Sequence, residues 1–325
     1  MKAALHTAFG EPAAVLAAGQ APLPIPQPGE VRIRTLLAPI HNHDLWTVRG
    51  RYGYTPPLPA VGGSEAVGLI DALGDGVEGL STGQRVAAAS VHGTWAEAFI
   101  APARMVIPVP AEIDDELAAQ LIAMPLSALM LLEFLQVKPG GWIVQNAANG
   151  AVGKTLAMLA AARGVNLVSL VRSAHGVRAL QALGIDPVVS TATEGWMDAV
   201  RALTGPDLAS AAVDSVGGSA SGELVALLGE GGTLVSFGSM SGEPMQIPSG
   251  DVIFKQATVK GFWGSRVSQA MPVEDKHRLV GELLAQAAAG GLKLPVRAVY
   301  DLDHVRDAVT TSLETGSNGK VLLRP

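Results

Sequence analysis

The sequence predicts an α/β protein of two domains, one made of short β-strands and one built on a doubly wound parallel sheet. The chain has 325 residues, about twice the roughly 150 residues of a typical domain. Residues 1–102 consist of short apolar stretches separated by proline and glycine, which is typical of a compact β-module. From Trp142 onward, β-branched stretches alternate with Ala- and Leu-rich stretches of helical period. This alternation indicates parallel strands joined by crossover helices.

The same patterns place the individual elements. Expected strands of the first domain lie in residues 31–40, 66–74, 84–90 and 94–102. In the second domain, expected strands at 142–147, 165–172, 186–191, 209–216, 231–239 and 253–263 accompany expected helices at 154–164, 175–184, 221–232 and 276–291. Residues 294–325 return to short strands and one helix. We therefore predict one domain from 1–115 with 290–325, and a second from 116–289.

Composition and charge exclude several kinds of site. The chain has no cysteine, so disulfides, thiol nucleophiles and thiolate metal ligands are excluded. With 23 Lys and Arg against 29 Asp and Glu, the net charge is −6, and no nucleic acid partner is expected. The N-terminus lacks the apolar segment of a signal peptide. We expect a cytoplasmic protein.

One apolar stretch, residues 117–137, has the length of a membrane span. It contains Gln120, Pro125 and Glu133 and lacks an aromatic belt or basic flanks. We interpret it as a buried helix and expect no membrane contact.

The expected strand at 142–147 leads directly into a turn of small residues and then a helix. Ala147, Gly150 and Gly153 have the spacing of the dinucleotide fingerprint, with alanine at the first position. Small residues permit a tight turn and let backbone amides approach a pyrophosphate at the helix N-terminus. Arg172 follows the second strand, where a basic residue suits the 2′-phosphate of NADP and an acidic one the ribose of NAD. The sequence thus predicts NADPH as the cofactor.

Histidines and acids near residue 44 raise the question of a metal. His41, His43, Asp44 and Glu65 could together supply nitrogen and oxygen ligands. We favour the interpretation that the two histidines are pocket or surface residues, and we predict no metal.

Tyr52 and Tyr54 lie in the proline-rich segment 49–59. A phenol with an ordinary pKa near ~10 stays protonated at neutral pH and can donate a proton to a developing carbanion. On the residues alone, both tyrosines are candidates.

Four strings, GRYGYTPPLPAVGGSEAVG, HGTWAEAFIAP, QNAANGAVG and DVIFKQATVKGFW, resemble the medium-chain dehydrogenase/reductase superfamily. Within it, the chain is similar to the zinc-free trans-2-enoyl thioester reductases and the NADPH:quinone oxidoreductases. The resemblance covers nearly the whole chain and implies a GroES-like β-rich catalytic domain and a Rossmann domain that binds NADP. It also implies that Tyr52, ten residues before Gly62 of the Gly-Gly-x-Glu string, is the proton donor.

The resemblance implies further site residues. Four are expected to line the substrate pocket: His41, Tyr54, Met124 and Ser127. Cofactor contacts are implied at Asn149, Gly150, Ala151, Val152, Gly153, Arg172, Phe237, Gly238, Ser239, Met240, Phe262, Trp263, Gly264 and Lys320.

The chain departs from its relatives at several of these positions. Zinc alcohol dehydrogenases have a cysteine ligand where this chain has His41 and a histidine ligand where it has Ser64, so one ligand is replaced and one is lost. Enoyl and quinone reductases have asparagine at the position of His41. In the enoyl reductases an asparagine also stands in place of Met124, and a threonine in place of Ser127. The enoyl reductases have an Arg-x-Arg string for the 2′-phosphate, and this chain has only its first arginine, Arg172.

The resemblance implies NADPH-dependent reduction of an α,β-unsaturated carbonyl compound such as a 2-enoyl thioester, with hydride added to the β-carbon and a proton supplied by Tyr52. Three alternatives stay open: a quinone or enone oxidoreductase, an alcohol dehydrogenase of the zinc type without the usual ligands, and a non-enzymatic NADPH-binding redox sensor. We expect a small-molecule substrate and a homodimer joined through the strand at 253–263.

Overall fold

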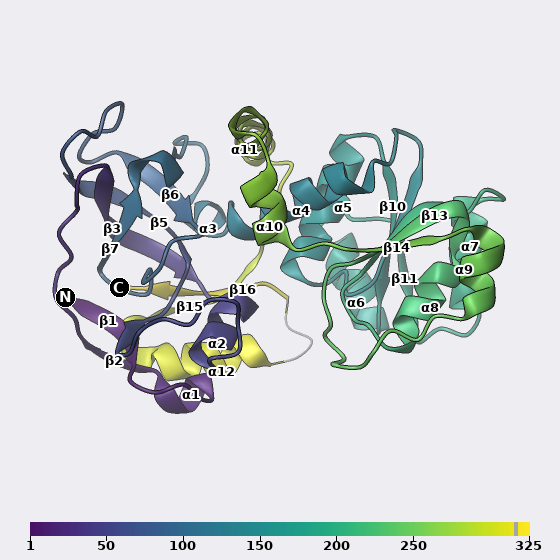
Figure 1. The fold of residues 1–325 in the computed structure, drawn as a ribbon, viewed down its shortest axis with the longest axis horizontal. Coiled ribbons are helices and arrows are strands. Elements are labelled where there is room, and N and C mark those ends of the chain that lie inside the picture. Colours follow the sequence, from purple (N-terminus) through teal and green to yellow (C-terminus); the bar gives the residue numbers. More distant parts are fainter. Residues whose placement is uncertain (315–317) are drawn as a thin grey trace. The chain divides into compact units, whose positions relative to one another are not determined.

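A computed structural model describes residues 1–314 and 318–325, which form two compact units (Figure 1). Unit 1 comprises Met1–Ala123, Leu283–Ala288 and Leu294–Pro325, and unit 2 comprises Met124–Glu282 and Ala289–Lys293. Unit 1 therefore continues past residue 115, where we placed the boundary. The reason is local: the backbone amides of Ile122 and Ala123 donate hydrogen bonds to the buried carboxylate of Glu65.

Unit 1 is the β-rich module. A three-stranded sheet has the order β2-β1-β4, and a larger sheet has the order β15-β16-β3-β5-β6-β8, with β7 pairing with β3. Its strands are β1 (Lys2–His6), β2 (Ala17–Gln20), β3 (Glu30–Pro39), β4 (Ala60–Val61), β5 (Glu65–Leu73), β6 (Arg85–Ala89), β7 (Ala98–Pro102), β8 (Val106–Pro108), β15 (Val296–Asp301) and β16 (Lys320–Arg324). Its helices are α1 (Pro12–Val15), α2 (Asn42–Val48), α3 (Asp115–Ala118) and α12 (Val305–Leu313), with 3-10 turns at Ala103–Met105 and Leu302–His304.

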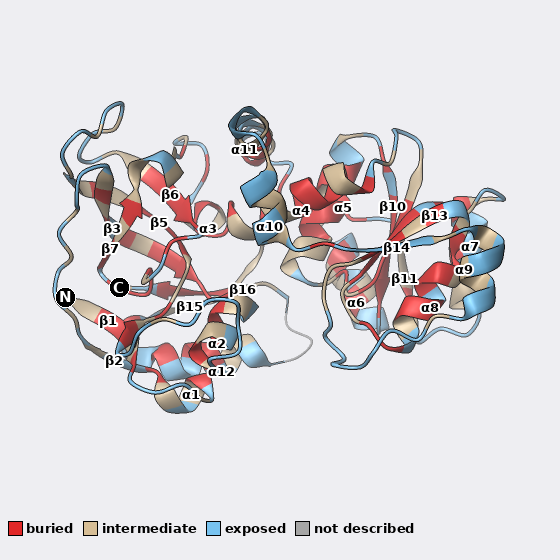
Figure 2. Ribbon diagram, in the orientation of Figure 1, coloured by how far each residue is buried: buried red, intermediate tan, exposed pale blue. Residues whose placement is uncertain are grey.

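Trp95 belongs to the buried core of unit 1 and packs against the residues that precede β5. It is fully buried, and its Nε1 donates to the carbonyl oxygen of Pro39 at 3.0 Å. Gly62 and Gly63 pack against the indole so closely that a Cβ on either would lie only 2.3 or 2.4 Å from ring carbons. In Figure 2 much of strands β3, β5 and β6 of this unit is drawn in red, the colour of buried residues. Because no larger residue fits at these two positions, the chain turns there and delivers Ser64 and Glu65 to a fixed place.

Unit 2 carries a six-stranded parallel sheet of order β11-β10-β9-β12-β13-β14. Its strands are β9 (Trp142–Gln145), β10 (Asn166–Val171), β11 (Val188–Ser190), β12 (Ala209–Asp214), β13 (Leu228–Ser236) and β14 (Thr258–Gly261). Its helices are α4 (Ala123–Leu135), α5 (Ala151–Ala162), α6 (Ala174–Gln181), α7 (Trp196–Thr204), α8 (Ser219–Ala226), α9 (Ser249–Lys255), α10 (Gly264–Ala270) and α11 (Val273–Ala288), whose C-terminal part is assigned to unit 1. The strand order reverses direction between β9 and β12, and ligands of such sheets bind at the carboxyl ends of the strands beside this point.

The prediction of one strand over residues 253–263 is wrong in its first part. Residues up to Lys255 belong to helix α9, and only Thr258–Gly261 pair with β13. The ammonium group of Lys255 donates to the carbonyl oxygens of Val225 and Ala226, which fixes the end of the helix.

The apolar stretch 117–137 also differs from the single helix we predicted. It contains the end of α3 and, after a break at residues 119–122, the whole of α4. The break coincides with the backbone amides that bond to Glu65. Among the residues that the structure describes, no helix has the length and apolar character to cross a membrane.

Candidate functional site

The turn between β9 and α5 has the geometry that the fingerprint predicts. Ala147 adopts a left-handed conformation with φ 49°, which glycine adopts more easily and which explains why the first fingerprint position is small. A Cβ on Gly153 would lie 2.8 Å from the Cα of Ala148, so only glycine lets the helix pack this closely. Gly150 is the N-cap residue of α5, and the buried Oδ1 of Asn149 has no partner among the described atoms. The free helix N-terminus and this unpaired oxygen fit a dinucleotide phosphate and its hydroxyl groups.

A buried polar network that our sequence analysis missed holds the ends of β9 and β12 together. Asn146 donates to Asp214 at 2.7 Å and accepts from the backbone amide of Ser215 at 2.7 Å. Asp214 also accepts from the hydroxyl of Ser221 at 2.5 Å and from two backbone amides. Burial acts to raise the pKa of Asp214, but these hydrogen bonds outweigh it and lower the pKa below its usual value. The carboxylate thus fixes the loop after β12 at the carboxyl edge of the sheet.

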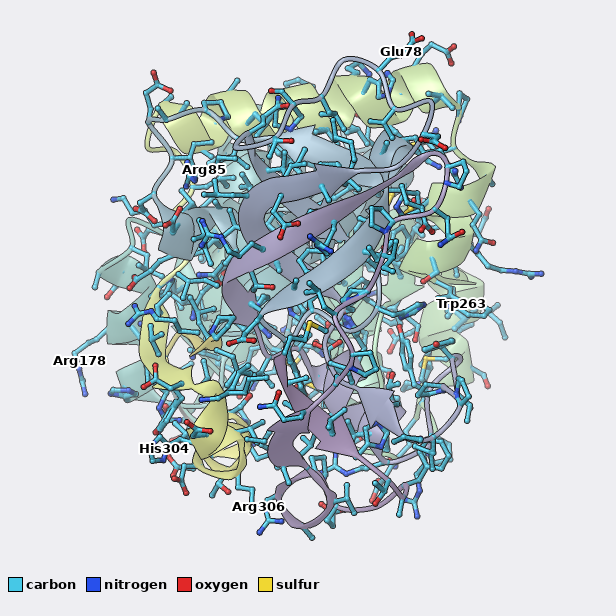
Figure 3. The ribbon with its side chains drawn as sticks, turned by 90° about the vertical axis from the view of Figure 1, so that its left-hand side faces the viewer. Glu78, Arg85, Arg178, Trp263, His304 and Arg306 are labelled. Carbon is cyan, nitrogen blue, oxygen red and sulfur yellow. The ribbon has the colours of Figure 1, made fainter. Side chains whose placement is uncertain are left out.

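Arg172 directly follows β10 and is exposed, as are His175 and Arg178 near the start of α6. Arg178 points into solvent (Figure 3). The three basic side chains therefore lie at or after the carboxyl end of the second strand, as an NADP 2′-phosphate requires.

The remaining predicted residues of unit 2 lie after the next strands. Phe237–Met240 follow β13, and the backbone amide of Phe237 donates to the backbone carbonyl oxygen of Asp214 at 2.7 Å. Phe262 is buried and contacts the ring of Phe237 at 5.8 Å between centroids, whereas Trp263 is 59% exposed. Ser127 on α4 lies close to Gly264: a Cβ on Gly264 would be 3.2 Å from the hydroxyl oxygen of Ser127. Ser127 and the segment after β14 are thus neighbours, and Met124 lies one turn earlier on α4.

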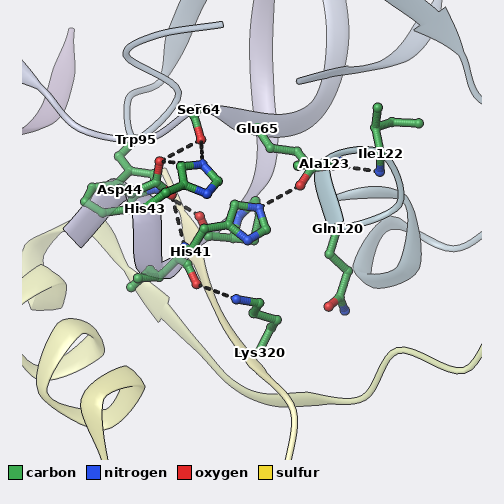
Figure 4. Close-up of polar contacts among 12 residues, drawn as sticks. His41, His43, Asp44, Ser64, Glu65, Trp95, Gln120, Ile122, Ala123 and Lys320 are labelled. Carbon is green, nitrogen blue, oxygen red and sulfur yellow. Dashed lines mark hydrogen bonds and ion pairs between the residues drawn. The ribbon is translucent and has the colours of Figure 1, made fainter. Parts of the chain in front are cut away.

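In unit 1, the residues around the start of α2 form a buried polar cluster (Figure 4). The ring of His41 and the carboxylate of Glu65 are both fully buried. Nε2 of His41 lies 2.7 Å from Oε2 of Glu65. The other carboxylate oxygen of Glu65 accepts from the amides of Ile122 at 2.7 Å and Ala123 at 2.8 Å. Every oxygen of this buried acid is therefore paired.

A second set of contacts lies beside this pair. The hydroxyl of Ser64 donates to Oδ1 of Asp44 at 2.6 Å, and Nε2 of His43 lies 2.7 Å from the same hydroxyl. Oδ2 of Asp44 accepts from the backbone amide of His41 at 3.0 Å. The ring of Tyr52 stacks on His43, with 5.7 Å between centroids and an interplanar angle of 28°. The structure thus brings Tyr52, but not Tyr54, beside this cluster.

Burial dominates the electrostatics of the cluster. It raises the pKa of Glu65 from 4.5 to about 7, against the opposing hydrogen bonds from Ala123 and Ile122. Burial and, next, the charge of Lys320 lower the pKa of His41 well below its usual value. Partial burial and the carboxylate of Asp44 raise the pKa of Tyr52. At neutral pH, His41 is neutral and Tyr52 is a protonated phenol that can act as an acid.

The candidate metal ligands do not fit a metal site. Among residues 1–314 and 318–325, no three His, Asp or Glu side chains are arranged to hold a metal ion. His41 and Glu65 bond to each other, and His43 bonds to Ser64. Nε2 of each histidine is thus engaged in a hydrogen bond.

Two predicted residues of unit 1 have other neighbours. Tyr54 stacks on His92, with 4.0 Å between ring centroids. Lys320, at the start of β16, donates to the carbonyl oxygen of Ile40 at 3.2 Å. Burial lowers the pKa of Lys320, and the carboxylates of Asp44 and Glu65 oppose that effect. Lys320 therefore belongs to the polar cluster of unit 1, and its predicted contact with the cofactor stays a prediction.

Comparison with known proteins identifies the family. Residues 27–111 match the model of the alcohol dehydrogenase GroES-like domain, and residues 151–277 match that of the zinc-binding dehydrogenase. The chain is 30% identical to the mitochondrial enoyl-[acyl-carrier-protein] reductase of Homo sapiens, over 99% of this chain and 88% of that one. The chain belongs to the medium-chain dehydrogenase/reductase superfamily. It is also 34% identical to the Caenorhabditis elegans enzyme of the same name, over 89% of this chain and 84% of that one.

Solved structures of the superfamily have the same fold. The quinone oxidoreductase of Escherichia coli, solved in complex with NADPH, matches with a TM-score of 0.89 and 25% identity over 100% of both chains. The quinone oxidoreductase of Pseudomonas syringae matches with a TM-score of 0.87 and 26% identity over 100% of this chain and 99% of that one. The predicted fold class, a GroES-like domain and a Rossmann domain, is confirmed.

Proposed function

We propose that this member of the superfamily is an NADPH-dependent reductase of α,β-unsaturated carbonyl compounds, of the 2-enoyl thioester type. The observation that carries the proposal is Tyr52, a half-exposed phenol whose pKa is raised, held against the ring of His43. A reductase of this type needs an acid that stays protonated at neutral pH and faces the reacting carbon. The similarity to enoyl-[acyl-carrier-protein] reductases supports this substrate class.

The residues of unit 2 would hold the cofactor. The backbone of Asn149–Gly153 fits the pyrophosphate at the N-terminus of α5, and Arg172 suits the 2′-phosphate of NADPH. When bound, the nicotinamide supplies a hydride, which is required at the β-carbon of the substrate. The relatives solved with NADPH support this cofactor.

Tyr52 completes the reduction. Hydride addition leaves an enolate, and the phenol of Tyr52 transfers its proton to the α-carbon, so that the double bond becomes a single bond and the tyrosine becomes a phenolate. The net reaction consumes one hydride and one proton. A phenol made less acidic by partial burial and by Asp44 holds its proton until the more basic enolate forms.

Replacing Tyr52 with phenylalanine tests this role. We expect kcat for a crotonyl thioester to fall about a hundredfold or more, with the Kd for NADPH unchanged in a fluorescence titration. Tyr300→Phe is the matched control, because Tyr300 bonds to Thr311 in another part of unit 1. Equal turnover in Tyr52→Phe and wild type would exclude Tyr52 as the donor.

A quinone or enone reductase is the second candidate, because the solved relatives of this fold include quinone oxidoreductases. Quinol oxygens take protons from water without a dedicated donor. A panel of enoyl thioesters, enones and quinones with NADPH separates the two. Turnover of quinones alone, unaffected by Tyr52→Phe, would favour the second candidate.

Strand β14 favours the homodimer that we predicted. It is the edge of the unit 2 sheet, and all four of its residues are exposed. Nearby apolar side chains are also exposed, with Phe254 at 85% and Ile253 at 65%. Such an edge is usually covered, and antiparallel pairing of two copies of β14 would cover it. Light scattering of the wild type and of Val259→Lys should show a dimer and a monomer, respectively.

A further inference from the structure

A chain of hydrogen bonds links Asp44, Ser64 and His43 and determines which nitrogen of His43 carries hydrogen. Ser64 has one hydroxyl hydrogen and donates it to Asp44 at 2.6 Å. Its oxygen is then an acceptor toward Nε2 of His43, 2.7 Å away, so Nε2 carries a hydrogen. The side chain of His43 is 25% exposed, and no described residue bonds to Nδ1. Figure 4 shows dashed lines from the hydroxyl of Ser64 to both Asp44 and His43. Nδ1 is therefore left to exchange protons with water and with the site.

The ring of His43 is also fixed from both sides. It stacks on the buried ring of His41 at 5.0 Å and 17°, and on the half-exposed ring of Tyr52 at 5.7 Å and 28°. Two stacked neighbours and the bond to Ser64 leave the ring little freedom to turn. His43 thus connects the buried cluster to the phenol.

The charged groups around His43 come from four segments. From its own helix, Asp44 lies 3.5 Å from Nε2. Glu65 at the start of β5 and Lys320 on β16 act on the same cluster with opposite charges, and His92 feels the Asp44 carboxylate from the loop after β6. His41 is neutral, because burial lowers its pKa. The nearest charge to the ring of His43 is the carboxylate of Asp44.

We propose that His43 is the proton relay that reprotonates Tyr52, with Ser64 and Asp44 as positioning residues. This inference rests on the proposed function, in which Tyr52 becomes a phenolate in each turnover. Protonated His43 gives its Nδ1 proton, through one water molecule, to the phenolate oxygen and becomes neutral, while its Nε2–H still donates to the oxygen of Ser64. Nδ1 then takes a proton from solvent. One proton enters for each proton that Tyr52 has given to the α-carbon, and no electrons move.

Ser64 stands where zinc alcohol dehydrogenases have a histidine ligand, and here its hydroxyl is the middle of the hydrogen-bond chain. Ser64, which replaces a zinc ligand, thus serves to position the ring of His43.

The pH profile of kcat should be measured in the wild type and in His43→Gln, Ser64→Ala and His304→Gln. Imidazole is the side chain that changes charge near neutral pH. We expect His43→Gln to lower kcat for a crotonyl thioester about tenfold at neutral pH, to flatten the profile, and to regain turnover with added imidazole. Ser64→Ala should give a smaller loss in the same direction. His304→Gln is the control, because His304 is exposed and lies beside Asp307, outside the cluster, and it should keep the wild-type profile.

The outcomes separate the two proposals. An active wild type with an unchanged pH profile in His43→Gln overturns the relay and leaves the proposed function intact. A wild type that reduces no enone or enoyl thioester overturns the proposed function. In that case, nitrogen-15 NMR of the histidines decides the relay: an Nε2–H tautomer of His43 that is lost in Ser64→Ala, and a His43 titration midpoint that moves in Tyr52→Phe, support it. A His43 that titrates independently of both residues overturns it.

Discussion

Replacing Glu65 with glutamine removes the charge from the centre of the buried pair while keeping its shape. The glutamine oxygen can accept from the same two backbone amides, and its NH2 group can donate to Nε2 of His41. Replacing Glu65 with alanine instead leaves those two amides and the imidazole without partners in a fully buried place. The two variants therefore separate the effect of charge from the effect of hydrogen bonding.

The magnitude follows from the pKa. Burial raises the pKa of Glu65 from 4.5 to about 7 in the folded chain. Between these values the unfolded chain has released the proton and the folded chain has kept it, so the free energy of unfolding falls as pH rises through this window. At about 1.36 kcal/mol per unit of pKa, the whole loss is roughly 3 kcal/mol, of which about 2.5 kcal/mol falls between about pH 5 and about pH 8. The free energy of unfolding of Glu65→Gln should not show this fall with rising pH.

Urea unfolding at several pH values measures the difference. The pKa of His41 is lowered by burial, which weakens the fold at acid pH in both proteins and so largely cancels between them. Between about pH 5 and about pH 8, we expect the free energy of unfolding of Glu65→Gln to rise by about 2.5 kcal/mol relative to that of the wild type. We expect the free energy of unfolding of Glu65→Ala to be about 3–5 kcal/mol lower than that of the wild type. A difference between glutamine variant and wild type that is constant with pH would refute the raised pKa. A glutamine variant as unstable as the alanine variant would refute the exchange of hydrogen bonds.

Three further changes test other parts of the structure. Gly153→Ala places a Cβ 2.8 Å from the Cα of Ala148, so we expect a loss of about 1–3 kcal/mol in stability and weaker NADPH binding in a fluorescence titration. Arg172→Ala should raise the KM for NADPH about tenfold, since a hydrogen bond to a charged group contributes about 1.5–3 kcal/mol, while the KM for NADH stays the same; equal changes for both cofactors would contradict this. Trp95→Phe removes the bond to the carbonyl of Pro39 and should cost about 1–3 kcal/mol in urea unfolding, with unchanged NADPH binding.

The nucleotide-binding segment could be predicted from the sequence because its constraints are local. Ala147, Gly150 and Gly153 are close in the chain, and the need for small residues in a strand–turn–helix is a property of that segment. The structure adds the reasons: a left-handed φ at Ala147 and a missing Cβ at Gly153. Asp214 was missed, because an aspartate at the end of an apolar strand has no local pattern that shows its partner, Asn146, 68 residues earlier in the chain.

The choice between Tyr52 and Tyr54 shows a similar limit. Chemistry alone left both tyrosines open, and only the resemblance to the enoyl reductases selected Tyr52. In the structure Tyr52 stacks on His43, and Tyr54 stacks on His92. The strand predicted over 253–263 was wrong at its start because Ile253 and Phe254, which are typical of strands, lie on the exposed side of helix α9.

By itself, the sequence determined the two-domain α/β class, the dinucleotide turn, the absence of thiol chemistry and the candidates for the acid. Each of these depends on composition or on residues near one another in the chain. Only the tertiary structure decided that Glu65 meets His41 and that Ser64 links Asp44 to His43, since these contacts join residues 20 to 24 positions apart, near the starts of α2 and β5. It also decided the pKa directions, because the raised pKa of Glu65 and the lowered pKa of His41 both arise from burial, which depends on the packing of the whole unit.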